Sequence, residues 1–356
     1  MVRKIMAAAL AAAMLFSFAA CKKSEEETTQ PMPEETTAVQ PAAPRPVPSA
    51  DRNPLTGVSG YDESLAGRKM TGIVVENSPD ARPQWGMSSP DVIMEYEVEG
   101  GITRMLWLYA DESRVPSKVG PVRSARHDPV ELAIGYDMLF VHCGGSNFAL
   151  DLISATPALS QIEGLTYSGC FERDQTRNVS SEHRYCLLGD KLRASIDELK
   201  LDMTADPAKA YPFLFTDEST PRQLAGGTCT DIKISYSTSY NFDFSYDAAA
   251  GLYACSLNGT PRTDDAGKQC AYSNVIVLYT DMIDMGTSSG HQDLLLENGG
   301  RGVYVNGGNY EDITWAKPTA NDPLRLYSAD GSELTLNCGN SYVGFVRSTQ
   351  EAKTTF

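Results

Sequence analysis

The hydrophobic and polar positions between residues 71 and 111 alternate with the period of a β-strand. Residues 71–77, "TGIVVEN", form one apolar run, and residues 91–111, "DVIMEYEVEGGITRMLWLYAD", form two runs that meet at Gly100 and Gly101. In the first of these two runs the apolar residues share one side of a strand and the glutamates share the other: Val92, Met94, Tyr96 and Val98 against Glu95, Glu97 and Glu99. Two such runs around a glycine pair predict a β-hairpin.

The pattern between this hairpin and residue 200 changes to alternating helices and strands. Asp128, followed by a proline, predicts a capped helix start, with the helix running to about Tyr136. Residues 138–143, "MLFVHC", predict a short apolar strand, and Ser146 is the expected N-cap of a second helix. Asp190 is expected to cap a third helix, which ends at Lys200.

From about residue 211 onward, β-branched and aromatic residues alternate with polar ones and are interrupted by turn sequences such as "LNGT" and "NGGN". This pattern predicts mostly antiparallel sheet, with residues 274–280, "NVIVLYT", as its most buried strand. The predicted fold class is therefore α+β. An N-terminal mixed α/β domain, residues 53–208, is followed by a smaller β-rich domain, residues 209–356.

The N-terminus has the composition of a secretory signal peptide, residues 1–20. Arg3 and Lys4 precede an unbroken run of small and apolar residues, which ends directly before Cys21. That run is shorter than the roughly 20 residues that span a bilayer. A cysteine at the cleavage point predicts a bacterial lipoprotein with its lipid on Cys21, although Phe18 occupies a position where leucine is usual. The alternative is an ordinary cleaved signal and a soluble secreted protein; both place the protein outside the cytoplasm.

Residues 21–52 begin at the lipidated cysteine and are rich in proline, threonine and glutamate. They contain too few large apolar groups to repay the entropy of ordering, so a disordered tether is predicted. The formal net charge of the whole chain is -16. This charge argues against nucleic acid as a partner and against direct adhesion to anionic lipid. Membrane attachment is therefore expected through the lipid on Cys21, which must carry more than one acyl chain to be stable.

The remaining cysteines predict neither a fixed disulfide pattern nor a metal site. Their number is odd, so at least one thiol stays free, and their pairing is open: Cys143, Cys170, Cys186, Cys229, Cys255, Cys270 and Cys338. No close pair has the spacing of zinc ligands, and no histidine has a partner at metal-binding spacing. We therefore expect no metal and no cofactor.

Charged residues at the predicted strand ends form a candidate ligand site: Arg82, Arg104, Arg123, Arg126, Glu97 and Glu99. Arginine presents a planar fork that suits carboxylate or phosphate. The functional hypothesis is that these arginines hold an anionic ligand. The alternative is that each pairs with a glutamate of the hairpin and stabilises the fold. We expect an ion pair for Arg126 and a ligand contact for Arg123.

A catalytic alternative depends on His142 and Ser146. His142 ends an apolar strand, Ser146 follows two glycines, and a glutamate of the hairpin could orient the histidine. The Gly-x-Ser-x-Gly pattern of a nucleophile elbow fails, because Phe148 stands at the second glycine position. A hydrolase would need His142 and a nucleophile exposed together in a cleft, about 3 Å apart or bridged by one water.

Several long stretches closely resemble the YerB-like lipoproteins: "NPLTG" (53–57), "ARPQWGMSSPDVIMEYEVEGGITRMLWLY" (81–109), "VGPVRSAR" (119–126), "VHCGGS" (141–146), "NGGNYEDITWAK" (306–317) and "LYSADGSELTLNCGNSYVGFV" (326–346). The resemblance covers residues 53–347. It implies a lipoprotein in which an α/β domain precedes a smaller β-rich one. That family has no settled biochemical function and supplies no catalytic residues.

These observations predict a membrane-anchored, extracytoplasmic lipoprotein of two domains. The predicted function is non-catalytic binding of an anionic cell-envelope ligand or of a protein partner. The alternative is a cell-envelope hydrolase that uses His142 with Ser146 or with a carboxylate of the hairpin.

Overall fold

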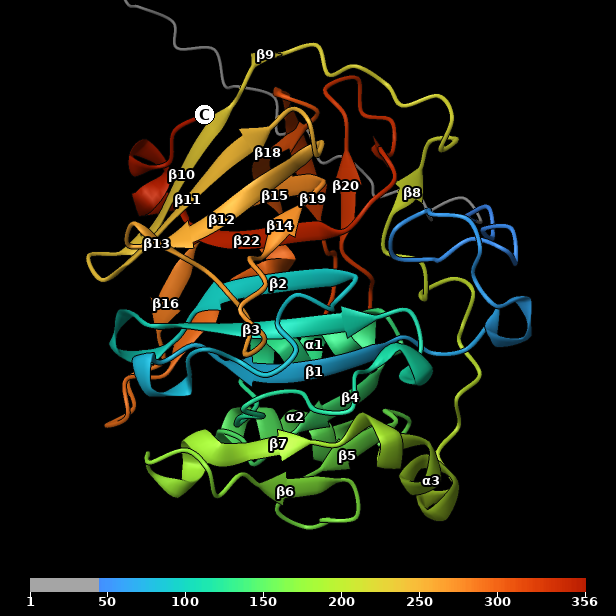
Figure 1. The fold of residues 1–356 in the computed structure, drawn as a ribbon, viewed down its shortest axis with the longest axis vertical. Helices are drawn as coiled ribbons and strands as arrows, with labels where there is room; N and C mark the ends of the chain where they lie inside the picture. The colour runs from blue at the N-terminus through green and yellow to red at the C-terminus, as the bar shows by residue number, and fades with distance from the viewer. Residues whose placement is uncertain (1–44) are drawn as a thin grey trace, which may run out of the picture. The chain divides into compact units, whose positions relative to one another are not determined.

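The structure is a computed structural model that describes residues 45–356 (Figure 1). The predicted signal peptide, Cys21 and the tether up to residue 44 lie outside the described residues. The last residues of the predicted tether, 45–52, lie against the folded body. Arg45 donates a hydrogen bond from Nε to Glu333 Oε1 at 2.6 Å, and Arg52 donates from Nη1 to the carbonyl of Thr216 at 3.1 Å.

An eleven-stranded mixed sheet forms the centre of the molecule. Its strands lie in the order β20-β19-β18-β15-β22-β2-β3-β1-β4-β5, and β9 pairs with β19. Their bounds are β1 Thr71–Glu76, β2 Val92–Glu97, β3 Thr103–Tyr109, β4 Leu139–His142, β5 Gln161–Glu163, β9 Gly227–Thr228, β15 Asn274–Thr280, β18 Gly300–Asn306, β19 Asn309–Ala316, β20 Arg325–Tyr327 and β22 Ser341–Arg347.

The predicted strands of the first half are confirmed, and so is the hairpin. β2 and β3 pair antiparallel on either side of Gly100 and Gly101. The division of β2 into two sides is also confirmed: Met94 packs in one hydrophobic cluster and Ile93 in the other. Both sides of the strand are covered, however, and Glu95 is fully buried.

The large sheet continues across the predicted domain boundary. β2 pairs in parallel with β22, from Val92 opposite Ser341 to Tyr96 opposite Phe345. β22 in turn pairs in parallel with β15, every residue of which is buried, as predicted for residues 274–280. The chain segments before residue 208 and after residue 209 therefore share one sheet.

A second, five-stranded antiparallel sheet covers one side of the large sheet (Figure 1). It contains β10 Asp231–Ser237, β11 Tyr240–Asp247, β12 Leu252–Leu257, β13 Thr260–Pro261 and β14 Ala271–Tyr272. Aromatic rings fill the space between the sheets; the centroids of Phe244 and Tyr342 are 4.8 Å apart. Gly344 permits this close packing, because a Cβ there would lie 2.5 Å from the hydroxyl of Tyr236.

Three α-helices are present in the described residues: α1 His127–Gly135, α2 Asn147–Ala155 and α3 Gly189–Leu199. α1 and α2 pack on the side of the large sheet opposite the five-stranded sheet (Figure 1). The predicted cap of α2 is confirmed, since Ser146 Oγ accepts a hydrogen bond from Ala149 N at 3.2 Å.

The predicted caps of α1 and α3 are wrong. The N-cap residues are Arg126 for α1 and Leu188 for α3, each two residues before the predicted cap, and neither makes a side-chain cap hydrogen bond. Asp128 and Asp190 lie instead inside the first helical turn, where a negative charge favours the helix dipole. Asp128 Oδ1 accepts a hydrogen bond from Leu294 N of β17, Gln292–Leu294, at 2.9 Å. The Asp128 carboxylate thus accepts a hydrogen bond from a residue distant in the sequence and not from a backbone N–H at the start of its own helix.

Residues 45–356 also contain three two-stranded sheets and seven short 3-10 helices. The sheets pair β6 Phe171–Arg173 with β7 Tyr185–Leu187, β8 Leu214–Phe215 with β21 Thr335–Leu336, and β16 Met282–Asp284 with β17 Gln292–Leu294. The 3-10 helices are η1 Glu63–Leu65, η2 Pro79–Ala81, η3 Glu99–Gly101, η4 Glu112–Arg114, η5 Ser181–Arg184, η6 Leu296–Asn298 and η7 Ser348–Lys353. β17 contacts α1, so the β16–β17 hairpin lies beside the start of that helix.

All seven cysteines of residues 45–356 are free thiols. Cys255 lies on β12 and Cys270 directly precedes the partner strand β14, and Cys255 N donates a hydrogen bond to the carbonyl of Cys270 at 2.9 Å. Both side chains are buried, and burial raises the pKa of the Cys270 thiol to about 11. At neutral pH these thiols are therefore protonated and unreactive.

Candidate functional site

Charged side chains gather at one edge of the large sheet. β1 and β2 are both antiparallel to β3, and β4 is parallel to β1. The carboxyl ends of β1, β2 and β4 therefore lie at the same edge of the sheet. The loop 122–126 runs along this edge, held by the hydrogen bond from Arg123 N to Val74 O. The carboxyl ends of parallel strands are where binding sites form most often in such folds.

Arg104, near the start of β3, is the least compensated of the predicted arginines. The residue is 5% exposed, and Nη1 donates to the carbonyl of Ser124 at 2.7 Å. Nε has no hydrogen-bond partner, and no carboxylate of residues 45–356 forms an ion pair with this side chain. Burial, together with the charges of Arg126 and Arg123, lowers the pKa of Arg104 to about 10. The fold thus holds a buried guanidinium with no carboxylate of residues 45–356 in direct contact, and Glu99, which pairs with Arg126, is the nearby negative charge that favours its charged form.

Arg126 forms the ion pair that the sequence analysis expected for it. Its fork contacts both carboxylate oxygens of Glu99, and Nη2 donates to Oε2 at 2.8 Å. Burial alone would raise the pKa of Glu99, but the hydrogen bonds and the charge of Arg126 outweigh it and lower that pKa. This pair fastens the turn of the β2–β3 hairpin to the residue that precedes α1.

Arg123 is more weakly engaged and partly exposed. Its Nε lies 3.4 Å from Glu76 Oε1, and its Nη1 lies 3.5 Å from Glu182 Oε2. Glu76 already accepts hydrogen bonds from Ser78 Oγ at 2.8 Å and pairs with His183 Nδ1 at 2.9 Å. The fork of Arg123 therefore keeps donors that no well-formed hydrogen bond uses.

The structure does not bring Arg82 and Glu97 to this cluster. Arg82 donates to Asn77 Oδ1 at 3.0 Å and lies over the ring of Tyr240, between the two sheets. Glu97 lies 3.2 Å from Arg347 of β22. Burial raises the pKa of Glu97, although the charge of Arg347 opposes this. Arg82 therefore links the end of β1 to β11, and Glu97 links β2 to β22, so both side chains have structural contacts away from the cluster.

The geometry of His142 and Ser146 does not support the hydrolase alternative. His142 is fully buried, and its Nδ1 and Nε2 lie 2.8 Å from Gly144 O and 2.9 Å from Gln161 Oε1. A general base needs a free nitrogen within reach of its nucleophile. Ser146 uses its oxygen to cap α2. Neither residue meets the condition that the sequence analysis set for a hydrolase.

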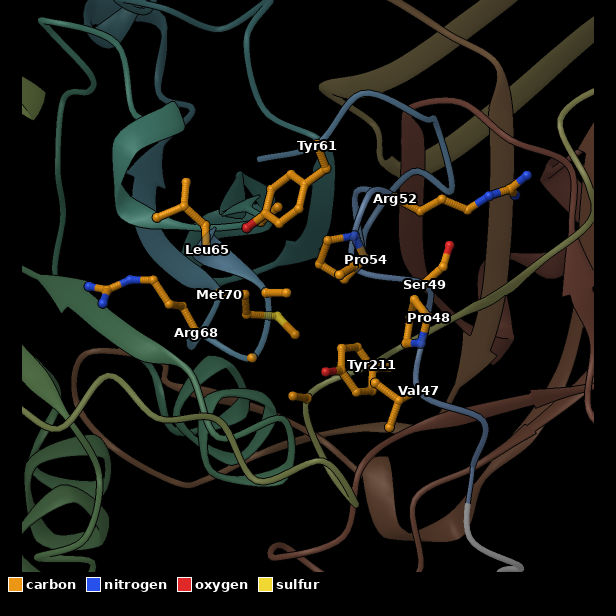
Figure 2. Close-up of a pocket in the computed structure, with 15 residues that line it drawn as sticks. Val47, Pro48, Ser49, Arg52, Pro54, Tyr61, Leu65, Arg68, Met70 and Tyr211 are labelled. Carbon is orange, nitrogen blue, oxygen red and sulfur yellow. The ribbon is translucent and has the colours of Figure 1, made fainter. Parts of the chain in front are cut away.

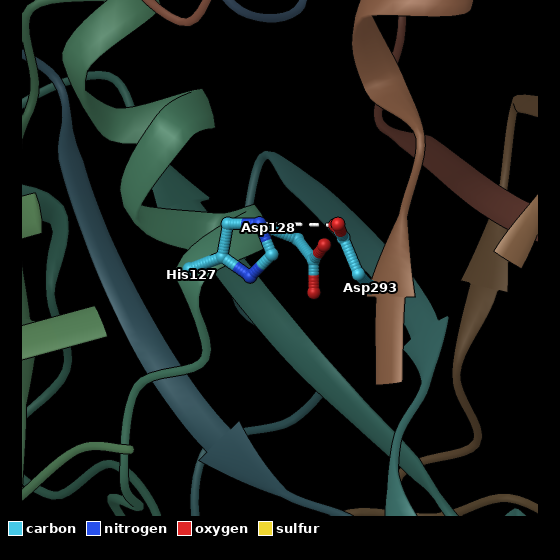
Figure 3. Close-up of side chains that lie close together, drawn as sticks. All are labelled: His127, Asp128 and Asp293. Carbon is cyan, nitrogen blue, oxygen red and sulfur yellow. Dashed lines mark ion pairs between the residues drawn. The ribbon is translucent and has the colours of Figure 1, made fainter. Parts of the chain in front are cut away.

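A second cluster, which the sequence analysis did not identify, lies at the first turn of α1. Figure 3 shows the side chains of His127, Asp128 and Asp293 gathered together. His127 Nε2 is 2.9 Å from Asp293 Oδ1. Burial would lower the pKa of His127, but the Asp293 hydrogen bond and the neighbouring carboxylates raise it to about 9. Burial raises the pKa of Asp128 to about 7. Asp293 is distant in the sequence, so residue spacing could not reveal the cluster.

A pocket of about 270 Å³ lies at the end of the predicted tether (Figure 2). It is lined mainly by apolar and aromatic groups, among them Val47, Pro54, Tyr61, Met70 and Tyr211. Figure 2 shows Arg52 and Arg68 pointing away from its centre; they form ion pairs with Asp217 and Glu112. The pocket therefore lacks the charge that an anionic ligand requires.

Comparison with known proteins identifies two family segments along the chain. Residues 55–202 match the family model described as the N-terminal domain of Protein of unknown function DUF3048, and residues 232–343 match the corresponding C-terminal domain. The chain belongs to the DUF3048 family. Its N-terminal segment contributes His127 and Asp128, and its C-terminal segment contributes Asp293.

The YerB protein of Bacillus subtilis is similar to this chain both in sequence and in structure. The chain is 30% identical over 298 residues to "Putative lipoprotein YerB" of strain 168, covering 82% of this chain and 85% of that protein. It also resembles the crystal structure of the YerB protein, with a TM-score of 0.70 and 27% identity, over 83% of this chain and 96% of that one. The α+β fold class and the resemblance to YerB-like proteins are thus confirmed for this DUF3048 member.

Proposed function

We propose that this DUF3048 protein is a lipid-anchored, extracytoplasmic binding protein that holds an anionic cell-envelope ligand without catalysing a reaction. The proposed anion site consists of Arg104 and Arg123. The observation that carries this proposal is the buried guanidinium of Arg104, which has an unpartnered Nε and no ion pair with a carboxylate of residues 45–356. A buried charge is costly unless it is paired, so folds usually supply a partner for it.

Neighbouring groups support an anionic partner. The hydroxyl of Tyr96, directly opposite Arg104 in the β2–β3 register, is buried and also lacks a hydrogen-bond partner. Arg123 supplies a second, partly exposed fork. A phosphate or carboxylate would satisfy these donors, and planar bidentate contacts suit both. Because the chain as a whole carries a charge of -16, only a local cluster of this kind would attract an anion.

The anchoring part of the proposal depends on the N-terminal sequence. A signal peptide ending at Cys21 is typical of bacterial lipoproteins, and the B. subtilis relative bears the name of one. None of the helices in residues 45–356 has the length and hydrophobicity of a membrane span. We therefore place the lipid on Cys21 and the folded body outside the cytoplasm.

Thermal melts of the mature chain with inorganic phosphate, pyrophosphate and glycerol-phosphate oligomers test the anion site. A ligand at 100 times its Kd should stabilise the native state by about 2.7 kcal/mol. In Arg123→Gln this gain should largely disappear, while the melting temperature without ligand stays nearly unchanged. The matched control is Arg301→Gln, which removes the same charge from an arginine side chain that is 74% exposed.

Two results would contradict the anion site. One is a wild-type chain that none of these anions stabilises. The other is an Arg123→Gln chain that melts many degrees lower without ligand, because the arginine would then serve to compensate Glu76.

Replacing Cys21 with alanine tests the anchor. The variant should leave the membrane fraction, either as a released protein or as an uncleaved precursor, because the predicted tether contains no other apolar anchor. Labelled fatty acid should enter the wild-type chain only. Incorporation of label into Cys21→Ala would show that the lipid is attached elsewhere.

A further inference from the structure

We propose that His127, Asp128 and Asp293 form a binding site for a divalent transition-metal cation. One ligand atom from each side chain can be chosen so that all three lie within 4.8 Å of one another. Divalent ions hold nitrogen and oxygen ligands at about 2.0–2.6 Å, so two ligands of one ion are at most roughly 5 Å apart. The three side chains already have the spacing of a coordination shell (Figure 3).

An excess of negative over positive charge is an independent reason to place a cation there, because His127 is the one cationic side chain of residues 45–356 that pairs with either aspartate. Asp128 is 3% exposed, and its only hydrogen bond comes from Leu294 N. No lysine or arginine of residues 45–356 lies within ion-pair distance of Asp128 or Asp293. A carboxylate this deeply buried needs a bound cation or a proton.

The surroundings add further carboxylates and little positive charge. Glu131 Oε1 is 4.0 Å from His127 Nε2, and Glu297 lines the same small pocket. The nearest lysine, Lys317, lies 3.9 Å from Glu131 and donates hydrogen bonds to two backbone carbonyls. Four carboxylates are thus accompanied by one lysine and one histidine. A divalent cation would bring the positive charge of the cluster closer to its negative charge.

Two features decide how such an ion would bind. The positive end of the α1 dipole opposes a cation, but this effect is small beside the attraction of two carboxylates at contact distance. A pocket of about 170 Å³, lined by His127, Glu131, Asp293 and Glu297, opens next to the cluster. Three protein ligands leave coordination positions free, and water from this pocket could fill them.

The ligand set favours Mn²⁺ or Zn²⁺ over Mg²⁺ and Ca²⁺. Carboxylates alone would suit the hard cations, but an imidazole nitrogen shifts the preference toward transition metals. The ligands come from α1 and from the β16–β17 hairpin, so an ion would cross-link the two family segments. It should therefore stabilise the folded chain as well as bind to it.

Mn²⁺ is the better first probe, because it avoids the free thiols that would bind Zn²⁺. The mature chain, purified without a histidine tag and treated with EDTA, is titrated with MnCl₂ and followed by electron paramagnetic resonance and by thermal melts. We expect one Mn²⁺ per chain, a raised melting temperature, and spin-echo modulation from an imidazole nitrogen. MgCl₂ and CaCl₂ should bind more weakly.

Two aspartate variants test whether the ion binds at the His127–Asp128–Asp293 cluster. Asp293→Asn keeps the shape of a partly exposed side chain, and it should weaken Mn²⁺ binding by at least about tenfold. Asp284→Asn, which removes an exposed carboxylate from the same hairpin, is the matched control and should bind like the wild type. Circular dichroism confirms that both variants fold. Arg123→Gln should also bind Mn²⁺ normally, so failure of the anion site and failure of the metal site are distinguishable.

The proposal is overturned if the EDTA-treated wild-type chain binds no stoichiometric Mn²⁺ or Zn²⁺. It is also overturned if Asp293→Asn and Asp284→Asn bind Mn²⁺ equally, or if the bound Mn²⁺ shows no coupling to nitrogen. Those last two results would place the ion among exposed carboxylates elsewhere on this acidic chain.

Discussion

At the scale of single residues, the ion pair between Glu95 and Arg262 is a deeply buried connection between the two sheets. Glu95 lies on β2, Arg262 follows β13, and Arg262 Nη1 donates to Glu95 Oε2 at 2.8 Å. Asn77 and Tyr342 donate further hydrogen bonds to the same carboxylate, at 2.8 and 3.1 Å. Because the carboxylate is fully buried, its partners determine whether it can remain charged.

Replacing Arg262 with methionine should therefore reduce the free energy of unfolding by about 3–5 kcal/mol, because it leaves a buried carboxylate without its counter-charge. Chemical denaturation of the wild type and the variant measures this loss. The double variant Glu95→Gln with Arg262→Met should recover a large part of it. A single-variant loss below about 1 kcal/mol would mean that water reaches Glu95.

At the scale of secondary structure, the turn of the β2–β3 hairpin is fastened to the start of α1. The Glu99–Arg126 pair makes this connection, and the pKa of Glu99 is lowered as a result. A carboxyl whose pKa is lower in the folded state stabilises the protein above its unfolded pKa. That contribution is lost as the pH falls through the folded-state pKa.

The stability difference between the wild type and Glu99→Gln should accordingly be largest at neutral pH. It should shrink as the pH falls below the ordinary glutamate value of 4.5. Urea denaturation at a series of pH values from about 7 to 3 measures it. Glu351→Gln serves as control, since its partner Arg301 is exposed. A difference independent of pH would show that Glu99 acts through packing and not through its charge.

At the scale of the whole molecule, the central sheet joins the two family segments. β1 to β5 come from the first and β15, β18, β19, β20 and β22 from the second, and they meet along the parallel β2–β22 pair. The segment between α3 and β10 contains exposed residues at 206–208 and 217–221. A protease would reach the backbone there first.

Limited proteolysis should consequently cut near residues 205–221 and yield two resistant fragments that remain associated. Size-exclusion chromatography without denaturant should recover them together, and separation should require urea. Fragments that separate at once would mean that each segment folds on its own, as the predicted domains at 53–208 and 209–356 imply. First cleavage within 274–280 would contradict the burial of β15.

Local sequence determined much of the secondary structure of this protein. The period-two pattern of β2 and the glycine pair after it specify a hairpin, and Ser146 specifies the start of α2, because strand alternation and helix capping involve only neighbouring residues. The predicted signal peptide at residues 1–20 and the predicted lipid on Cys21 likewise depend on local composition. Caps at Asp128 and Asp190 were expected for the same local reasons, and the fold used other residues.

Tertiary structure alone decided what the charged residues do. Arg126 and Arg123 are three positions apart, yet one is fully paired with Glu99 and the other keeps unused donors. Asp293 joins His127 only because the β16–β17 hairpin packs on α1. The energy of a charge depends on its burial and on the charges within a few ångströms, and those neighbours come from distant parts of the chain. The sequence predicted an ion pair for Arg126 with the hairpin, but it could not reveal that Asp293 lies beside His127.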